Sequence, residues 1–288
     1  MSDKKKMGFF QKTKNMTDTN LLLAITMIVF FAMYIGAMIF GGKGFLKAQT
    51  FLNMLNANAA LIIASCGMSI VMITGSIDIS VGGVAALVSM CCAVYLDYHG
   101  GNVVTAIFIS LGIGLLFGLV QGYLVAYLDI QPFIVSLAGM FFARGMTTIV
   151  NTAPFNVQNE AFVKLKETRV IVPGLGSVNK LGKYVNAYVE IGVVVALILV
   201  IVLFCMLRWS KSGRNFYAVG GNQQSALMLG INVKKTKFMA HLLCSLLAGI
   251  GGFVYFMHVG SVSASHATGM EMHAIASSII GGTPLTGR

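Results

Sequence analysis

The chain has 288 residues, of which 57% are hydrophobic and only 10% are charged, and its formal net charge is +11. Soluble domains carry about 25% charged residues, so this composition excludes an ordinary soluble globular protein and indicates an integral membrane protein. Apolar runs of about twenty residues recur, whereas alternating strands of about ten residues do not, which favours helical spans. The positive charge lies at the edges of these runs, where anionic lipid and the positive-inside rule account for it. We therefore expect no nucleic-acid binding.

The apolar runs predict an all-α fold, a polytopic transmembrane helical bundle of seven spans. Residues 21–288 form the predicted membrane domain, and residues 1–20 form an N-terminal arm. The first run is too long for a signal-peptide core and no small-residue cleavage site follows it, so we expect it to be retained as a span. The predicted spans cover about residues 21–40, 51–73, 81–97, 103–128, 132–150, 187–207 and 238–257.

Basic residues predict how the chain is oriented in the membrane. The N-terminal arm carries five lysines, and residues 208–237 carry six basic residues and no acid. Six predicted spans separate the two regions, so both lie on one side, and their charge predicts that this side is the cytoplasm. We expect residues 151–186 to form an external loop, broken up by Pro154, Pro173 and several glycines, with one short helix near residues 158–167. This loop is either a solvated connector or a contact for a soluble partner.

Residues 208–237 are polar and basic, and they contain both end signals of a short helix. Asn222 is a good N-cap, and Gly230 suits the left-handed residue that closes a helix. About two turns of helix lie between them, too short to be stable alone in water, so we expect this helix to dock onto a partner. Lys234 and Lys235 are expected to hold its base to anionic lipid. The residues expected in the docking helix and at its ends are Gly221, Asn222, Ser225, Ala226, Leu227, Leu229 and Gly230.

An acid at position 78 indicates a break between the second and third spans. Asp78 is flanked by glycines and by the hydroxyl residues Thr74, Ser76 and Ser80. Bare lipid would leave the backbone of such a segment unpaired, so we expect a broken helix pair that faces a cavity or is buried in protein. Two interpretations remain open. Asp78 is a structural cap for the helix that starts near residue 81, with Ser80 as a rival, or it lines a translocation path or its gate.

Two further charged residues are candidates for the same path. Arg144 lies about three turns into the fifth span, where a guanidinium costs roughly 3 kcal/mol unless it is paired or hydrated. Either Asp78 pairs with it or its side chain snorkels to the external face. Glu271 is the third candidate, in a stretch that also contains His273.

Other polar and small residues have plainer explanations. The five cysteines fall inside apolar runs without metal-ligand spacing and are expected to be packing residues. Gly114, Gly118 and Gly122 recur at intervals of four, which favours close helix packing. We find no phosphate-binding loop and no nucleophile paired with a base, so we expect no enzymatic activity, no metal site and no bound cofactor. The histidines expected at the membrane interface are His241, His258 and His266.

Four blocks of the sequence resemble, in order, the motifs of sugar permeases in the ATP-binding-cassette (ABC) importer family, of the ribose, xylose and galactose type. Residues 74–82 resemble its Thr-Gly-x-Ile-Asp-Leu-Ser-Val-Gly signature, and residues 132–145 resemble Pro-Phe-Ile-Val-Thr-Leu-Gly…Arg-Gly. Residues 208–237 resemble the cytoplasmic coupling segment. Residues 271–283 resemble Glu-Leu-Asp-Ala-Ile-Ala…Ile-Gly-Gly-Thr.

This resemblance implies the membrane-spanning subunit of an ABC importer for a pentose or hexose, in the bacterial inner membrane with the N-terminus in the cytoplasm. The implied partners are ABC ATPase subunits that consume the ATP, a periplasmic or lipid-anchored sugar-binding protein, and a second copy or a related permease. The ATPases would pull on a coupling helix from Asn222 to Leu229. The residues expected in the translocation path or gate are Thr74, Asp78, Ser80, Arg144 and Glu271.

The sequence departs from the family pattern at three places. Gln223-Gln224-Ser225-Ala226-Leu227 stands where Glu-Glu-Ala-Ala-Arg is usual, and His273 stands where an aspartate is usual. The pattern also continues beyond residue 288 into further spans, so we expect that C-terminal spans are missing from the chain. The alternatives are a nucleoside or branched-chain amino-acid permease, an ion-coupled secondary transporter that uses Asp78 and Glu271, and a non-transporting remnant.

Overall fold

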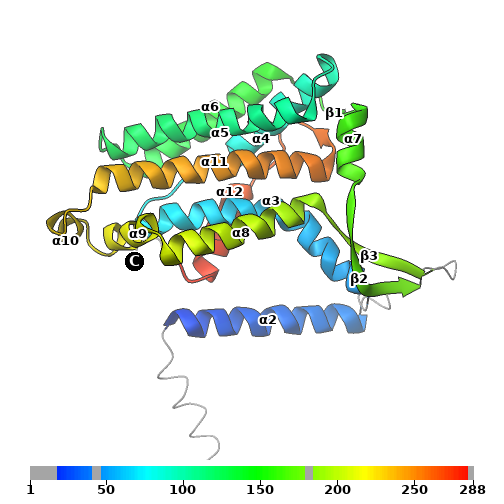
Figure 1. The fold of residues 1–288 in the computed structure, drawn as a ribbon, viewed down its shortest axis with the longest axis horizontal. Helices are drawn as coiled ribbons and strands as arrows, with labels where there is room; N and C mark the ends of the chain where they lie inside the picture. Colours follow the sequence, from blue (N-terminus) through cyan, green and yellow to red (C-terminus); the bar gives the residue numbers. More distant parts are fainter. Residues whose placement is uncertain (1–17, 41–46, 179–183, 285–288) are drawn as a thin grey trace, which may run out of the picture.

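The computed structural model describes residues 18–40, 47–178 and 184–284, which form a bundle of helices (Figure 1). Seven helices are long and apolar enough to cross a membrane, which confirms the predicted number of spans in the described part of the chain. They are α2 (Asp18–Phe40), α3 (Ala48–Ile73), α4 (Val81–Tyr98), α5 (Val103–Ala126), α6 (Pro132–Val150), α8 (Ile191–Trp209) and α11 (Val233–Val259).

Local signals set several of these helix ends. The side chain of Asn102 caps α5 by accepting a hydrogen bond from the backbone N–H of Val104 at 2.9 Å. Pro132 occupies the first turn of α6, where its missing N–H leaves no helical bond unmade. Gly260 closes α11 with a φ of 74°, a conformation that favours glycine.

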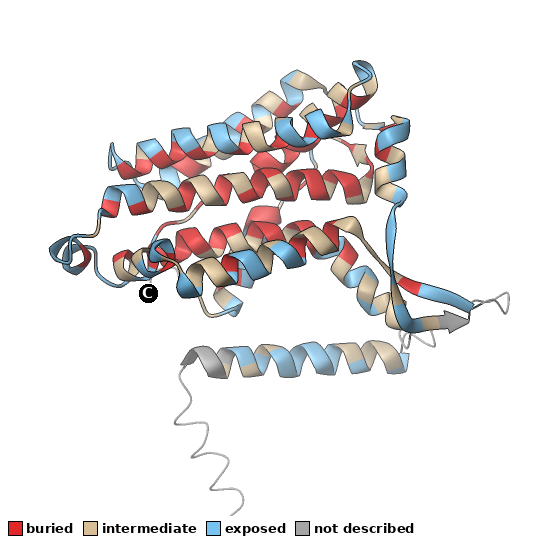
Figure 2. Cartoon of the chain, viewed as in Figure 1, coloured by how far each residue is buried: buried red, intermediate tan, exposed pale blue. Residues whose placement is uncertain are grey.

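Helix α11 lies in the middle of the bundle, where it packs against α3, α4 and α5 (Figure 1). The buried residues of these helices face one another, and α4 is buried around most of its surface (Figure 2). Helix α2 differs, because none of its described side chains is buried. The protein core is therefore built around α4 and α11, with α2 at the edge.

Two breaks interrupt the helices inside the bundle. Residues 74–80 separate α3 from α4, and residues 260–269 separate α11 from α12 (Met270–Ile280). Gly252, on α11, lies against Ala85 near the start of α4, and Gly82 lies against Glu271 in the first turn of α12. Both α4 and α12 thus begin in the interior. The broken helix pair predicted around Asp78 is present.

The predicted external loop is more ordered than expected. The expected short helix is α7 (Glu160–Glu167), but residues 169–190 form an antiparallel hairpin of β2 (Arg169–Val178) and β3 (Tyr184–Glu190). The prediction of an irregular loop here is wrong, because Pro173 sits in a register shift between Val172 and Gly176 and interrupts nothing else. A second short pair joins β1 (Phe155–Asn156) to β4 (Ser261–Val262).

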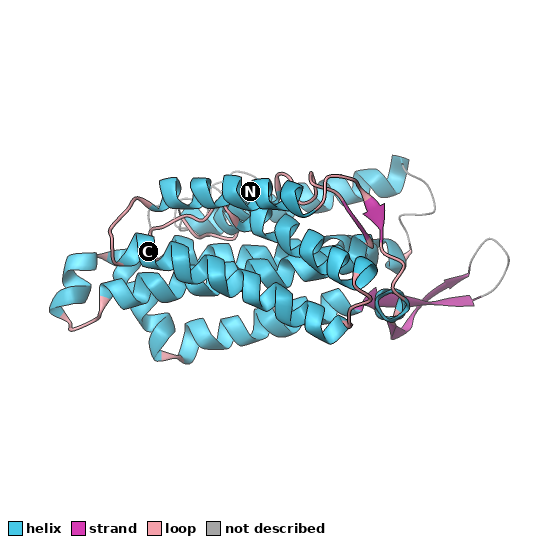
Figure 3. Cartoon of the chain, turned by 90° about the horizontal axis from the view of Figure 1, so that it is seen from above, coloured by secondary structure: helices cyan, strands magenta, loops and turns pink. Residues whose placement is uncertain are grey.

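The boundaries of the basic segment also differ from the prediction. An additional helix, α9 (Lys211–Gly221), precedes the expected short helix, which is α10 (Gln223–Met228). Helix α11 begins at Val233 and not near residue 238, because Asn232 caps it by accepting from the N–H of Lys235 at 2.9 Å. Figures 1 and 3 place α10 at one end of the bundle and the β2–β3 hairpin at the other.

Candidate functional site

The short helix α10 has the two ends that the sequence predicts. The side chain of Asn222 accepts a hydrogen bond from the N–H of Ser225 at 2.8 Å and so caps the helix. Gly230 has a φ of 76°, and its N–H donates to the carbonyl oxygen of Leu227 at 2.9 Å. Gly221 is exposed as the last residue of α9. These end groups give a helix of six residues a defined shape.

Helix α10 exposes apolar side chains. Leu227, Met228 and Leu229 are 59%, 89% and 77% exposed. Ala226 was expected on the same docking surface, but it is 1% exposed and packs with Val219 and Val233. Ala226 therefore attaches α10 to α9 and α11. Sequence reasoning missed Met228, because a helix of under two turns has too little periodicity to show which residues face outward.

Helix α9 connects α10 to the rest of the bundle. The hydroxyl of Ser210 caps α9 by accepting from the N–H of Gly213 at 3.0 Å. A β-carbon at Gly213 would collide with the backbone of Leu207 in α8, so glycine is needed for this close approach. Phe216 and Val219 are buried on the inner face of α9. Packed contacts therefore join α10 to α8, α9 and α11.

Asp78 is fully buried at the first break and holds it together. Its Oδ1 accepts hydrogen bonds from the N–H of Ser80 at 2.9 Å and from the Ser80 hydroxyl at 2.6 Å. Its Oδ2 lies 3.5 Å from the hydroxyl of Ser245, in the middle of α11. The Ser80 hydroxyl in turn accepts from the amide of Gln121 in α5 at 2.8 Å. The Thr74 hydroxyl donates to the carbonyl oxygen of Val71 at 2.7 Å and closes α3.

An unexpected histidine lies one turn from Ser245 on α11. His241 is fully buried, and neither of its ring nitrogens has a hydrogen-bond partner among the described residues. The prediction of an interfacial position for His241 is therefore wrong. The Oε1 of Gln121 is also buried without a described partner. Polar atoms buried in this way are rare in native proteins, and they gather here around the helix break.

Arg144 does not pair with Asp78, which was one of the two interpretations left open. Its Nη1 donates to the carbonyl oxygen of His266 at 2.5 Å, with the carbonyl oxygen of Ala264 at 3.5 Å. The guanidinium instead holds the backbone of the second break, where the carbonyl dipoles compensate its charge.

Glu271 lies where the two interior helix starts meet. It is 8% exposed, and its Oε1 accepts from the N–H of Gly269 at 3.3 Å. Its Oε2 is buried without a described hydrogen-bond partner, and a β-carbon at Gly82 would collide with it. His273, two residues further on, is exposed and lies outside this contact. In the sequence, the signal for this close approach is Gly82, which follows the Asp78 motif and has no side chain.

The two other histidines occupy structural positions. His258 Nδ1 lies within hydrogen-bond distance of Glu190 Oε2, at 2.6 Å. His266 contributes its backbone carbonyl to Arg144. Within the described ranges, no three His, Cys, Asp or Glu side chains are arranged to hold a metal ion. The site is thus a set of hydrogen-bonded and charged groups at two helix breaks, connected by α11 to the exposed helix α10.

Comparison with known sequences identifies this arrangement. The sequence model of the family described as "Branched-chain amino acid transport system / permease component" matches residues 50–288, most of the chain. The chain belongs to this permease family. With its seven candidate spans, the permease is a multi-pass membrane protein. No solved structure matches it significantly.

Several named proteins are similar to the permease over most of its length. The fructose import permease protein FruG of Bifidobacterium longum is 31% identical over 94% of this chain and 78% of its own length. The inner membrane ABC transporter permease protein YjfF of Escherichia coli is 33% identical, also over 94% of this chain and 78% of its own length. The ribose import permease protein RbsC of Escherichia coli is 31% identical over 84% of this chain and 72% of its own length.

Proposed function

We propose that this permease is the membrane-spanning subunit of an ABC importer that carries a monosaccharide across the bacterial inner membrane into the cell. Family membership supports the transport role, and the printed names of relatives that import fructose and ribose support the substrate class. The names of its relatives support a transport subunit, and in this proposal ATP is hydrolysed by separate ATPase subunits.

The observation that carries the proposal is the exposed apolar face of α10. Leu227, Met228 and Leu229 have no described neighbours to cover them, and an exposed apolar cluster at a helix end marks a site of protein contact. We assign this face to the ATPase subunit. Because Ala226 packs with Val219 and Val233, a force applied to α10 moves α9 and α11 together.

Helix α11 connects α10 to the proposed gate. Its residues Ser245 and His241 lie at the first break beside Asp78, and the second break follows its C-terminal end. In this proposal, the closing of the ATPases shifts α11 and changes the contacts of Arg144 with the 264–266 backbone and of Glu271 with Gly82. Thr74 and Ser80 form the hydrogen-bonded edges of the same gate.

The opposite end of the bundle is assigned to the sugar-binding protein. Helix α7 and the β2–β3 hairpin project there, and the amide N–H of Gln158 beside α7 is held by Asp97 at 2.8 Å, so this end is structured. In this orientation α10 and the start of α2 face the cytoplasm. A second copy or a related permease completes the channel.

The partner can be identified directly from native membranes. The tagged permease is solubilised gently, and the proteins that accompany it are identified by mass spectrometry. We expect an ABC ATPase in near-equal amount, and we expect Leu227→Asp to remove it, because a charge would be buried in an apolar contact. Gln224→Glu places an acid on the same helix and keeps a polar residue, so it should retain the ATPase. A wild-type permease that is recovered without any ATPase contradicts the proposal.

A change at the end of α10 tests whether the docking helix drives transport. Gly230→Pro cannot adopt a φ of 76°, whereas Gly230→Asn tolerates this region. We expect the proline variant to insert into the membrane normally and to lose uptake of radiolabelled monosaccharide, and the asparagine variant to keep it. Normal uptake by the proline variant would show that α10 is not the coupling element.

A further inference from the structure

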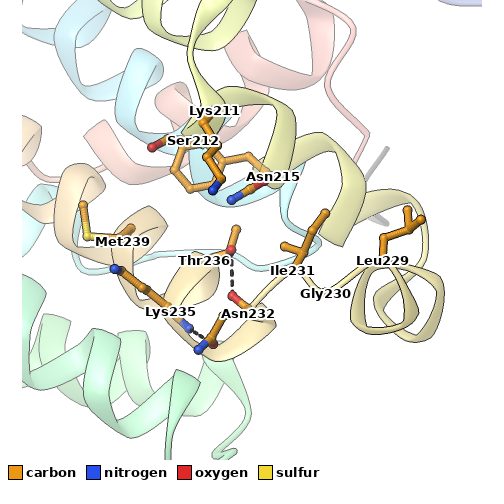
Figure 4. Close-up of a pocket in the computed structure, with 11 residues that line it drawn as sticks. Lys211, Ser212, Asn215, Leu229, Gly230, Ile231, Asn232, Lys235, Thr236 and Met239 are labelled. Atoms are coloured by element: carbon orange, nitrogen blue, oxygen red, sulfur yellow. Dashed lines mark hydrogen bonds between the residues drawn. The ribbon is translucent and has the colours of Figure 1, made fainter.

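A cavity of about 450 Å³ lies between α9 and α11, beside the residues that follow α10 (Figure 4). Lys211, Ser212 and Asn215 line it from α9, and Asn232, Lys235 and Thr236 line it from the start of α11. Its volume falls within the range of about 300–1,000 Å³ that is typical of ligand pockets in proteins. The cavity is separate from the helix breaks, and it borders the exposed apolar face of α10 at Leu229.

The lining of this cavity is basic. Lys211 and Lys235 come from different helices, and none of the lining residues is acidic. Residues 208–237, which form most of its surroundings, contain four further basic residues and no acid. Two lysines that face one cavity repel each other, so the site is better suited to an anion than to an empty or cationic state.

Both lysines occupy first-turn positions where a cation is unfavourable. Lys211 is the first residue of α9, and Lys235 is in the first turn of α11, close to the positive ends of the two helix dipoles. The caps Ser210 and Asn232 each satisfy one N–H and add no negative charge. Two lysines thus occupy unfavourable helix-start positions at one cavity. This indicates a function, because an anion bound there would compensate the charge of both lysines and of both helix ends.

The position of the cavity matches the headgroup layer of a bilayer. Trp209, at the end of α8, is 67% exposed, and Tyr217 on α9 and Tyr127 at the end of α5 are also exposed. Exposed tryptophan and tyrosine mark the interface between hydrocarbon and water. Phe216 and Met239 line the cavity as apolar neighbours of the lysines. An amphipathic occupant with a phosphate and a glycerol backbone fits this combination.

We propose that the cavity between α9 and α11 binds the phosphate of an anionic phospholipid, with Lys211 and Lys235 as its charged contacts. The lipid connects the two helices that hold α10, so its presence stabilises the coupling segment. The assignment uses the membrane location of the permease and is independent of the transported substrate. Soluble phosphate shares the same chemistry, and an acidic side chain of a docked protein is the other occupant that the test must separate.

The test uses native mass spectrometry of the full-length chain in detergent, with phosphatidylglycerol or zwitterionic phosphatidylcholine added in equal amounts. We expect one retained phosphatidylglycerol that phosphatidylcholine does not replace. Each lysine near a phosphate contributes roughly a fivefold factor in affinity, so Lys211→Gln with Lys235→Gln should weaken retention about twenty-five-fold. The matched control is Arg214→Gln with Lys237→Gln, which removes the same charge from the same two helices outside the cavity and should retain the lipid.

Three results would overturn the proposal. Equal loss of lipid in the two double variants would show that lipid binding depends on the general positive surface charge and not on this cavity. Displacement of phosphatidylglycerol by millimolar inorganic phosphate would make the soluble anion the occupant. Loss of the lipid whenever a docked ATPase is present would assign the cavity to an acidic side chain of that partner. The emission of Trp209, the single tryptophan of the chain, checks in each variant that α8 and α9 remain folded.

Discussion

At the scale of single residues, Gly82 sets the distance between two helices. The position that its β-carbon would take lies 2.9 Å from the carbonyl oxygen of Ala267 and collides with the carboxylate of Glu271. Gly82 lies within helix α4 and has no positive φ, so the requirement for glycine comes from space alone. The absence of one methyl group allows the starts of α4 and α12 to touch.

Gly82→Ala should therefore destabilise the permease. Overpacking of an interior contact costs about 1–3 kcal/mol, and we expect a lower midpoint of thermal unfolding in detergent together with reduced uptake. Gly145→Ala is the matched control, because a β-carbon at Gly145 meets nothing within 4 Å. An unfolding midpoint for Gly82→Ala that equals that of the control would contradict a tight contact between the two helix starts.

Two substitutions at Asp78 distinguish its structural role as a hydrogen-bond acceptor from the role of its charge. Asp78→Asn keeps a side-chain oxygen for the N–H and hydroxyl of Ser80, whereas Asp78→Leu leaves these buried donors unpaired at about 1–3 kcal/mol each. We expect the asparagine variant to unfold close to the wild-type midpoint and to lose at least tenfold in uptake. Wild-type uptake by a well-folded asparagine variant would reduce Asp78 to a helix cap and remove it from the gate.

Residue patterns predicted the acids of the site better than its partners. Asp78 and Glu271 stand out because an acid in an apolar stretch needs a reason, and both are buried at helix breaks. Gln121 and His241 were not recognised, because a single polar residue in a helix is equally compatible with a lipid interface. Only the packing of α5 and α11 against the break shows that these two side chains face inward.

At the scale of elements, the contact between α5 and α11 depends on glycines that face each other. A β-carbon at Gly114 would lie 2.7 Å from the carbonyl oxygen of Ser245, and one at Gly249 would lie 2.6 Å from that of Ser110. The stripe of small residues predicted on α5 thus has its partner on α11. Close backbone approach replaces the hydrophobic driving force that is missing between helices in lipid.

This contact provides a sharp comparison within one helix. Gly114→Ala should push α5 away from α11 and cost about 1–3 kcal/mol in stability. Gly112→Ala lies half a turn away, where a β-carbon meets nothing within 4 Å, and should be neutral or slightly stabilising because alanine favours helix. Thermal unfolding of the two variants in detergent measures the difference. Equal destabilisation by both substitutions would show that helix propensity, and not the α5–α11 contact, is at issue.

Helices with a long apolar run or with clear end signals could be predicted from the sequence. Elements whose sequence is interrupted by glycine or proline could not. All seven spans follow from apolar length, and α10 follows from its cap and its glycine. Helix α9 contains three glycines, and β2 contains Pro173 and Gly174. Glycine and proline favour loops, so the sequence of each segment taken alone predicts a loop. Their order comes from neighbours, since Gly213 packs on α8 and Gln49 of α3 binds the backbone of Tyr188 in the hairpin.

At the scale of the whole molecule, the two ends of the bundle should face opposite compartments. A cysteine at Met228, which is 89% exposed in α10, should react with a membrane-impermeant maleimide only in inside-out vesicles. A cysteine at Ile171, which is 60% exposed in β2, should react only in right-side-out cells. The five native cysteines lie within the spans, and the unmodified chain provides the background signal. Labelling of both positions from one side would overturn the proposed orientation.

The way in which Arg144 holds the second break has a consequence for how this permease can change over time. Its hydrogen bonds go to main-chain oxygens of residues 264 and 266, which every amino acid provides. The backbone conformation of this segment therefore does not depend on which side chains it carries. In the proposed gate, substitutions at Ala264, Ser265 and His266 should alter the side chains that meet the solute while the backbone stays in place. A transporter built in this way can acquire a new specificity without first losing its fold.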